Sequence, residues 1–326
     1  MKRILLAGLI SLPVLSSAYA EGAGSEAQPP KGPDVVPALQ VAHAERGLLL
    51  DVATAGAQAV AVGGFGSIMQ SQDGMTWKQV ASPVDVALTS VRFADDRNGW
   101  AVGHDAVILH TTDGGASWKI QNREPDLYSP LFSVEVIDAR RAIAVGAFGL
   151  IKQTQDGGST WTDVVAPSIS DDKLHLNSIA QLADGSFAVA GERGLLAWSA
   201  DGVEWKRLAS PYEGSFFGVV PWGEKGAIAY GMRGNVYASS DISAGQWKKI
   251  ETKTTASFFG SHFVRDGELM LMGSDGYVAV LSKDLKVSRW PAKSEKSPAG
   301  SVTGGAVVSG QLVLVGDAGA FSAALR

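Results

Sequence analysis

The sequence predicts an all-β protein, a seven-bladed β-propeller with four-stranded antiparallel blades. A short hydrophobic strand that ends in glycine recurs seven times, and the glycines are spaced by 40 to 45 residues. They are Gly63, Gly103, Gly146, Gly191, Gly231, Gly273 and Gly316. A repeat of this length made of strands and turns is typical of a propeller blade, whereas helical solenoid repeats need long runs of 3.6-residue periodicity. The 326 residues include 39 glycines, as turn-rich β-structure requires, and no such helical run.

Residues 1–20 have the pattern of an export signal. Lys2 and Arg3 precede an apolar run at 4–15, and a small-x-small cleavage site at 18–20 follows it. The run is shorter than the roughly 20 residues that span a bilayer, and no Cys is present for lipid attachment. We therefore expect cleavage before Glu21 and a periplasmic or otherwise exported protein. The lack of Cys excludes disulfides and thiolate metal sites.

Residues 21–37 contain four prolines among glycine and polar residues, and this composition predicts a flexible tether. Residues 38–326 form the predicted propeller. The formal net charge of the chain is -5, and it becomes -7 without the two basic residues of the signal. This negative charge disfavours a nucleic-acid partner or an anionic membrane surface.

Each repeat consists of an inner strand, the Ala-Val-Gly strand, a third strand and an outer strand that opens with Trp. The predicted inner strands are 48–53, 88–93, 131–136, 176–181, 216–220, 258–263 and 305–308. The seventh repeat lacks an outer strand, because the chain stops ten residues after Gly316. Proteins pair or cover an open sheet edge. We therefore expect residues 38–42 to supply the missing strand and to close the ring.

The turns before the outer strands carry Asp, Gly and Trp at fixed spacing, the pattern of an Asp-box. The strict copies are Thr111-x-Asp113-x-Gly115-x-x-Trp118 and Thr154-x-Asp156-x-Gly158-x-x-Trp161. Such an Asp accepts backbone N–H bonds, the Gly adopts positive φ, and the Trp packs between blades. We expect a structural role for Asp73, Asp113, Asp156, Asp201, Trp77, Trp118, Trp161 and Trp205.

Blades with Val-Gly-x-x-Gly followed by Asp-Gly-Gly-x-Ser/Thr-Trp resemble the photosystem II stability and assembly factor family, exported seven-bladed propellers built from neuraminidase-type (BNR) repeats. The resemblance covers nearly the whole mature chain, although repeats four to six depart from the strict Asp-box. It implies a non-catalytic binding scaffold, an assembly or accessory factor for a membrane protein complex. Relatives from non-photosynthetic bacteria are commonly encoded beside RND-type exporters and are regarded as periplasmic accessory factors. The implied partner is therefore an exported or membrane protein, either a photosystem subunit or a transporter.

Sialidases also contain Asp-boxes, so a glycoside hydrolase is the alternative function. Such an enzyme needs an arginine cluster, a Tyr nucleophile assisted by Glu, and an Asp acid/base. No tyrosine of this chain stands beside an evident Glu and Arg set, and the five histidines lack metal-ligand spacing. We therefore predict no catalytic residues, no metal and no cofactor. A propeller that binds a small ligand or cofactor is the third possibility.

The turns between the second and third strands of the blades are predicted to share one face with the crossovers between blades. Aromatic and Arg residues at such tips are typical of protein interfaces. The candidate partner-binding residues are Arg193, Arg233, Phe65, Phe148, Tyr128, Tyr212, His104 and Asp105. Two arginines on neighbouring turns are expected to clamp an acidic or carboxy-terminal segment of a partner. The alternative for the two Phe side chains is that they fold back over the inner strands as plugs.

Overall fold

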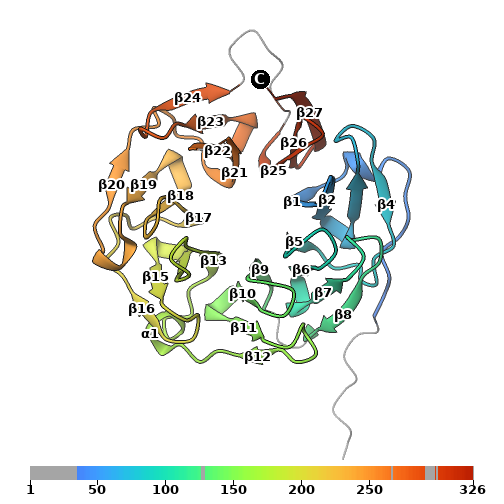
Figure 1. Ribbon diagram of the computed structural model, residues 1–326, viewed down its shortest axis with the longest axis horizontal. Coiled ribbons are helices and arrows are strands. Elements are labelled where there is room, and N and C mark those ends of the chain that lie inside the picture. Colours follow the sequence, from blue (N-terminus) through green and yellow to red (C-terminus); the bar gives the residue numbers. More distant parts are fainter. Residues whose placement is uncertain (1–34, 126–128, 266, 291–297, 299, 326) are drawn as a thin grey trace, which may run out of the picture. The chain divides into compact units, whose positions relative to one another are not determined.

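A computed structural model of the protein describes residues 35–325, except 126–128, 266, 291–297 and 299. In this part of the chain, six four-stranded sheets and one three-stranded sheet are arranged around a central axis (Figure 1). The sheets are antiparallel, and each contains consecutive strands, so every sheet is one blade. The predicted seven-bladed propeller is confirmed. The predicted signal at 1–20 and most of the predicted tether lie outside the described residues.

The strands of the first three blades have the following bounds. They are β1 (Leu49–Ala55), β2 (Gln58–Gly63), β3 (Ile68–Ser71), β4 (Lys78–Val80); β5 (Leu88–Phe93), β6 (Gly99–Gly103), β7 (Ile108–Thr111), β8 (Lys119–Asn122); β9 (Leu131–Val136), β10 (Ala142–Gly146), β11 (Ile151–Thr154) and β12 (Thr162–Asp163).

The last four blades continue the same order. They contain β13 (Leu176–Gln181), β14 (Phe187–Gly191), β15 (Leu196–Ser199), β16 (Trp205–Arg207); β17 (Phe216–Pro221), β18 (Ala227–Gly231), β19 (Val236–Ser239), β20 (Lys248–Ile250); β21 (Phe258–Arg265), β22 (Glu268–Gly273), β23 (Val278–Leu281), β24 (Val287–Trp290); β25 (Val302–Val308), β26 (Gln311–Gly316) and β27 (Gly319–Ala324). The predicted inner strands are confirmed, and β25 begins three residues earlier than predicted.

Short helical segments connect the strands. They are α1 (Pro167–Ser170) and the 3₁₀ turns η1 (Ala44–Arg46), η2 (Gly64–Gly66), η3 (His104–Ala106), η5 (Ala147–Gly149), η6 (Glu192–Gly194), η7 (Met232–Gly234), η8 (Ile242–Ala244) and η9 (Ser274–Gly276). Six of these turns, η2, η3, η5, η6, η7 and η9, join the second strand of a blade to the third.

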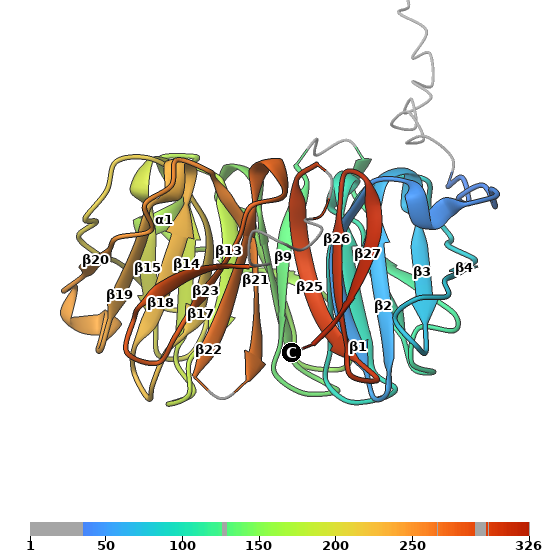
Figure 2. The same cartoon turned by 90° about the horizontal axis from the view of Figure 1, so that it is seen from above.

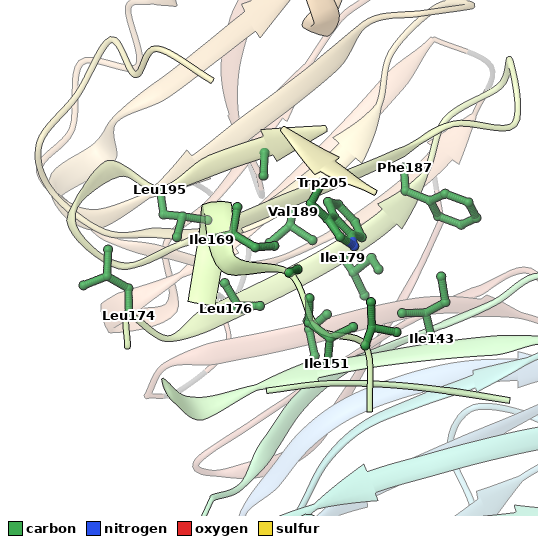
Figure 3. Packing of buried hydrophobic residues seen from close by; sticks show 14 residues of the cluster. Ile143, Ile151, Ile169, Leu174, Leu176, Ile179, Phe187, Val189, Leu195 and Trp205 are labelled. Atoms are coloured by element: carbon green, nitrogen blue, oxygen red, sulfur yellow. The ribbon is translucent and has the colours of Figure 1, made fainter. Parts of the chain in front are cut away.

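The core lies between blades, because each sheet buries both faces against its neighbours. The second strands show this most clearly, since β6, β10, β14 and β18 are buried at every position. Figure 3 shows one such layer, in which Ile143 and Ile151 of the third blade face Ile179 and Trp205 of the fourth. This two-sided burial accounts for the near-continuous hydrophobic Ala-Val-Gly strands.

The repeated glycine ends each second strand for a reason that the sequence pattern did not reveal. These residues have extended backbone rather than a left-handed turn conformation. A Cβ atom at Gly103 would lie 2.1 Å from the carbonyl oxygen of Ala87, and a Cβ at Gly316 would lie 1.9 Å from that of Ser301. The chain just before each inner strand therefore touches the glycine. Only glycine permits this close approach of two backbones.

The predicted closure of the ring by an N-terminal strand requires correction. The seventh sheet has three strands, β25, β26 and β27, and no described residue of 38–42 pairs with it. Instead, the N–H of Ala38 bonds to the carbonyl of Ser82 at 3.1 Å, and the side chain of Gln79 bonds to the backbone of Leu39 and Val41. The segment thus lies beside the outer part of the first blade. The turn η1 contacts β27 and partly covers the open edge.

The seam between the first and seventh blades is held by side-chain hydrogen bonds and apolar packing. The hydroxyl of Thr303 donates to the carbonyl of Leu49 at 3.1 Å, and that of Ser309 donates to the carbonyl of Gln72 at 3.0 Å. The hydroxyl of Ser322 donates to the carbonyl of Gly74. One buried cluster joins residues of both blades. The two ends of the propeller therefore meet without a shared sheet.

Gly319 tests the contribution of η1 to this seam. Its φ is +88°, and a Cβ would lie 2.2 Å from the carbonyl oxygen of Glu45. Gly310 also has positive φ, +75°, but a Cβ there would meet nothing within 4 Å. We expect Gly310→Ala to cost about 1 kcal/mol of unfolding free energy, from backbone strain alone. Gly319→Ala should cost about 2 kcal/mol more, because η1 must move.

Urea denaturation of the two variants beside the wild type provides the measurement. Equal losses of unfolding free energy in both variants would show that η1 does not support the seam.

Candidate functional site

The turns between second and third strands share one face with the crossovers between blades. The N–H of His104 bonds to the carbonyl of Ala87 at 2.9 Å, and that of Met232 bonds to Ser215 at 3.1 Å. Equivalent bonds join η2, η5, η6 and η9 to the chain before β1, β9, β13 and β21. Figure 2 shows the strands edge-on, running between two opposite rims of the propeller. The turn tips occupy one rim, which we call the tip face.

Six turns of the tip face hold a residue other than glycine in the left-handed conformation. These residues are Phe65, Asp105, Phe148, Arg193, Arg233 and Asp275, with φ between 50° and 57°. A side chain in this conformation costs roughly 1–2 kcal/mol. The same position is strained in six successive blades, so the left-handed conformation is a property of the repeated turn. Five of these residues are exposed, and Asp105 is half-buried.

The two Phe residues of the tip face are exposed. Phe65 is 85% exposed and Phe148 is 53% exposed. Phe148 lies beside His175, with ring centroids 4.9 Å apart, and its N–H bonds to Nδ1 of His175 at 3.2 Å. His175 in turn contacts Phe132 at a centroid distance of 5.5 Å. Phe65 therefore does not fill the channel as a plug, and Phe148 extends an aromatic path from the tip to the inner strand.

The two arginines line separate cavities. Arg193 borders a cavity of about 420 Å³ with Leu174, Asp172 and Arg207, and Asp172 is paired with Arg207. Arg233 borders a cavity of about 540 Å³ whose walls include Lys249 and Lys253. Both tip arginines are exposed.

The remaining candidates of the tip face differ in their surroundings. His104 is exposed, whereas Asp105 pairs with Arg123 at 3.0 Å. The ring of Tyr212 is half-buried and packs on Phe216 at a centroid distance of 5.7 Å. Tyr128 lies outside the described residues. The structure thus brings the exposed tips onto one face but directs Tyr212 into the fifth blade.

The Asp-box aspartates lie in the turns between third and fourth strands, on the rim opposite the tips. Asp113 accepts hydrogen bonds from the N–H and hydroxyl of Ser117 at 2.9 and 2.6 Å. Backbone N–H groups of Thr76 and Met75 lower the pKa of Asp73 to about 2. Asp156 and Asp201 accept equivalent bonds.

The tryptophans of these turns pack in the ring. Trp118 and Trp205 are buried, and their Nε1–H groups donate to the carbonyls of Gly115 and Gly202 at 3.0 and 3.1 Å. Nε1–H of Trp161 donates to the side chain of Gln121 at 3.1 Å. Trp77 packs against the seam cluster of the first and seventh blades.

The central channel contains a cluster of ionisable residues that sequence reasoning missed. Asp51 of β1, Arg92 of β5, Glu135 of β9 and His262 of β21 come from four inner strands, and Tyr230 comes from β18. Nη1 of Arg92 lies 2.6 Å from Oδ2 of Asp51. The residues are dispersed in the sequence, and each strand supplies only one member of the cluster. The available signal was their register, because Arg92, Glu135 and His262 each occupy the fifth position of an inner strand.

Burial sets the charge states in the channel. It raises the pKa of Glu135 to about 7, and the attraction of Arg92 opposes this shift only in part. It lowers the pKa of His262 to about 4, with a contribution from Arg92. It raises the pKa of Tyr230 to about 12. At neutral pH the channel therefore holds one ion pair, a neutral imidazole, a neutral phenol and a carboxyl group that is close to its titration midpoint.

The channel contains the residue types of a glycosidase but not their arrangement. The hydroxyl of Tyr230 donates to that of Ser261 at 3.0 Å, and its raised pKa opposes the activation of a nucleophile. Asp51 is engaged by Arg92 and by the N–H groups of Val52 and Val91. A single arginine stands where a sialoside carboxylate requires a cluster. Among the described residues, no group of three His, Cys, Asp or Glu residues has the geometry to hold a metal ion.

The proton on Glu135 predicts a pH dependence of stability. Folding raises the pKa of this carboxyl from 4.5 to about 7, so the folded state binds more protons than the unfolded chain between these values. The free energy of unfolding therefore falls as the pH rises through this window. Glu135→Gln should remove this loss of stability. The difference in unfolding free energy between the variant and the wild type should therefore shift in favour of the variant by about 1–3 kcal/mol between pH 5 and pH 8.

Urea denaturation of both proteins at the two pH values measures this difference, with the exposed Glu251→Gln as a matched control. A constant difference between Glu135→Gln and wild type would show that Glu135 titrates normally in the folded state.

Fold and surface define a β-propeller with an exposed tip face and a polar central channel. The profile of the family described as "Photosynthesis system II assembly factor YCF48" matches residues 69–304, and the chain belongs to this family. A segment of 81 residues is 35% identical to the chloroplastic photosystem II stability/assembly factor HCF136 of Cyanidioschyzon merolae. That segment covers 23% of this chain and 18% of the relative, so the match spans about a fifth of the relative's length.

Solved structures share the fold. A structure titled "YCF48 bound to D1 peptide" matches with a TM-score of 0.69 and 17% identity, over 90% of this chain and 100% of the other. YCF48 from Cyanidioschyzon merolae matches with a TM-score of 0.67 and 18% identity, over 85% and 95%. The WD40 propeller domain of Doa1 matches with a TM-score of 0.64 and 15% identity, over 85% and 92%. In the described part of the chain, no helix has the length and hydrophobicity needed to cross a membrane.

Proposed function

We propose that this protein is a non-catalytic binding scaffold that assists the assembly or operation of a membrane protein complex. Membership of the YCF48 family supports this role, and so does the similarity to a propeller described as bound to a D1 peptide. The observation that carries the proposal is the tip face, where six blades hold a residue other than glycine in the left-handed conformation and five of these residues are exposed. Exposed loop residues that a rigid scaffold presents on one face are characteristic of binding surfaces.

The proposed partner segment is acidic or ends in a carboxylate. Exposed Arg193 and Arg233 border two cavities on neighbouring blades, and Lys249 and Lys253 add positive charge beside Arg233. Arg pairs with carboxylates through two parallel hydrogen bonds while its stem covers apolar surface. Phe148 supplies an exposed aromatic contact on the adjacent blade. A segment that spans both cavities would therefore find charge and apolar surface together.

We further propose that the protein acts in the periplasm or another exported compartment. The export pattern of residues 1–20 supports this location. The partner is then a membrane or exported protein, either a photosystem subunit or, in a non-photosynthetic organism, an RND-type exporter. A pull-down from membranes followed by mass spectrometry distinguishes these two partner classes.

Double substitution of the tip arginines tests the proposed docking face. Arg193→Ala/Arg233→Ala should weaken partner capture by about 1–3 kcal/mol for each lost charged contact. Folding should be unaffected, because both side chains are exposed. The control is Gln72→Ala/Gln155→Ala, two exposed residues in turns of the opposite rim. Equal capture by both double variants would place the docking surface elsewhere.

The purified protein should not hydrolyse sialosides or aryl glycosides above background. The physical reason is that Tyr230 keeps its proton and Asp51 is committed to Arg92. A fluorogenic sialoside and a set of aryl glycosides provide the assay. Sustained turnover that disappears in Tyr230→Phe would identify a glycosidase and refute the scaffold proposal.

A further inference from the structure

We propose that the central channel binds a small organic ammonium ion, with the carboxylate of Glu135 as its counter-ion. This site is separate from the tip arginines and does not depend on which partner docks there. The proposal rests on a cavity, on the balance of charge within it and on the aromatic residues of its wall.

The cavity has a volume of about 320 Å³, at the lower end of the range for small-ligand pockets. All seven inner strands contribute to its wall. Polar side chains dominate, among them Ser133, Asn177, Ser178, Gln181 and Ser261. Most of their hydrogen-bonding groups already serve the propeller, since Asn177 donates to the carbonyl of Phe216 and Ser178 accepts from the N–H of Val219. Of the two acidic side chains of the wall, Asp51 pairs with Arg92, whereas Glu135 lies at salt-bridge distance from no cation in the described part of the chain.

The charges of the wall leave one negative charge without a partner when Glu135 ionises. Arg92 and Asp51 neutralise each other at 2.6 Å. His262 does not line this cavity and is uncharged, because burial and Arg92 lower its pKa to about 4. Tyr230 of the wall is uncharged, because burial raises its pKa to about 12. Arg92 attracts Glu135 but already donates to Asp51 and to the carbonyl of Val91. A cationic ligand supplies the missing charge.

An anionic ligand fits this wall poorly. It would compete with Asp51 for the guanidinium of Arg92 and would lie in the same cavity as Glu135. A cation instead gains a charge-assisted hydrogen bond to a carboxylate that is otherwise costly to ionise. Four phenylalanine side chains, Phe132, Phe217, Phe259 and Phe263, line the same cavity. Their ring faces attract ammonium groups, and their apolar surface accommodates an alkyl chain.

Binding of the ammonium ion must release a proton when Glu135 begins in its neutral form. The proton leaves Glu135 for solvent, and the ligand's positive charge replaces it. Affinity should therefore rise with pH until Glu135 is ionised without the ligand, at a pKa of about 7. For one linked proton, the affinity at pH 5.5 should be about thirtyfold lower than at pH 8. The other charged or titratable groups of the channel keep their states, since Arg92 remains paired and the pKa values of His262 and Tyr230 lie outside this range.

Isothermal titration calorimetry of the purified protein with n-butylammonium chloride tests the site. We expect saturable binding at pH 8, about thirtyfold weaker binding at pH 5.5, and release of a proton near pH 6, measured in buffers of different ionisation enthalpy. Sodium butyrate and n-butanol, which have the same chain with negative and zero charge, should not saturate. Preferred binding of butyrate would identify an anion site at Arg92 and overturn the proposal.

Glu135→Gln should lower the affinity for n-butylammonium by at least about tenfold, whereas the exposed Glu251→Gln should not change it. Near-ultraviolet circular dichroism confirms that each variant is folded. Should Glu135→Gln fail to fold, the proton release of the wild type still decides the question. Equal affinity in the two variants, or binding without proton release, refutes the assignment of Glu135.

Discussion

The propeller depends on bonds between inner strands that belong to different sheets. No strand is shared between blades, so a side chain of one inner strand reaches the backbone of the next. Asp51 accepts from the N–H of Val91, and Thr89 donates to the carbonyl of Leu131 at 2.7 Å. We call these bonds between inner strands the belt. Further bonds of the belt join Ser133 to Ile179, Ser178 to Val219, Asn177 to Phe216 and Thr303 to Leu49. The last of these crosses the seam, so the same device that connects neighbours also closes the ring.

The belt determines the contents of the channel. The third residue of each inner strand is small or short, because it lies where the next strand approaches. This position is Asp or Ser in the first four blades and Gly in the last three, namely Asp51, Ser90, Ser133, Ser178, Gly218, Gly260 and Gly304. A Cβ at Gly260 would lie 2.0 Å from the carbonyl oxygen of Thr303, and a Cβ at Gly218 would lie 2.1 Å from the ring of Tyr230. The glycines therefore admit Tyr230 and the neighbouring backbone to the axis. Larger charged side chains are left to the fifth position of the strand.

The period of the sequence alone predicts the blades, because the inner strand and the Ala-Val-Gly strand of each blade have the same pattern of buried positions. The tip face also follows from chain order. The open seventh blade could not be predicted, since the sequence shows a missing strand but not that η1 would cover the edge while residues 38–42 lie against the first blade. The channel cluster was missed for a different reason. Its members are separated by whole blades, and only the ring places Arg92 beside Asp51 and Glu135.

Tip face and channel differ in how freely their residues can change. At a tip, the backbone is fixed by the N–H bond to the crossover and, in five of the six strained turns, by a following glycine with positive φ. The backbone of the turn therefore does not depend on the central side chain, although Asp105 pairs with Arg123 and Phe148 packs on His175. In the channel, Asp51 holds both the next strand and Arg92, so a change there alters the belt as well as the charge. Partner choice is thus separable from the integrity of the ring, whereas Glu135 shares its cavity with Asp51, Ser133 and Ser178, which join the inner strands.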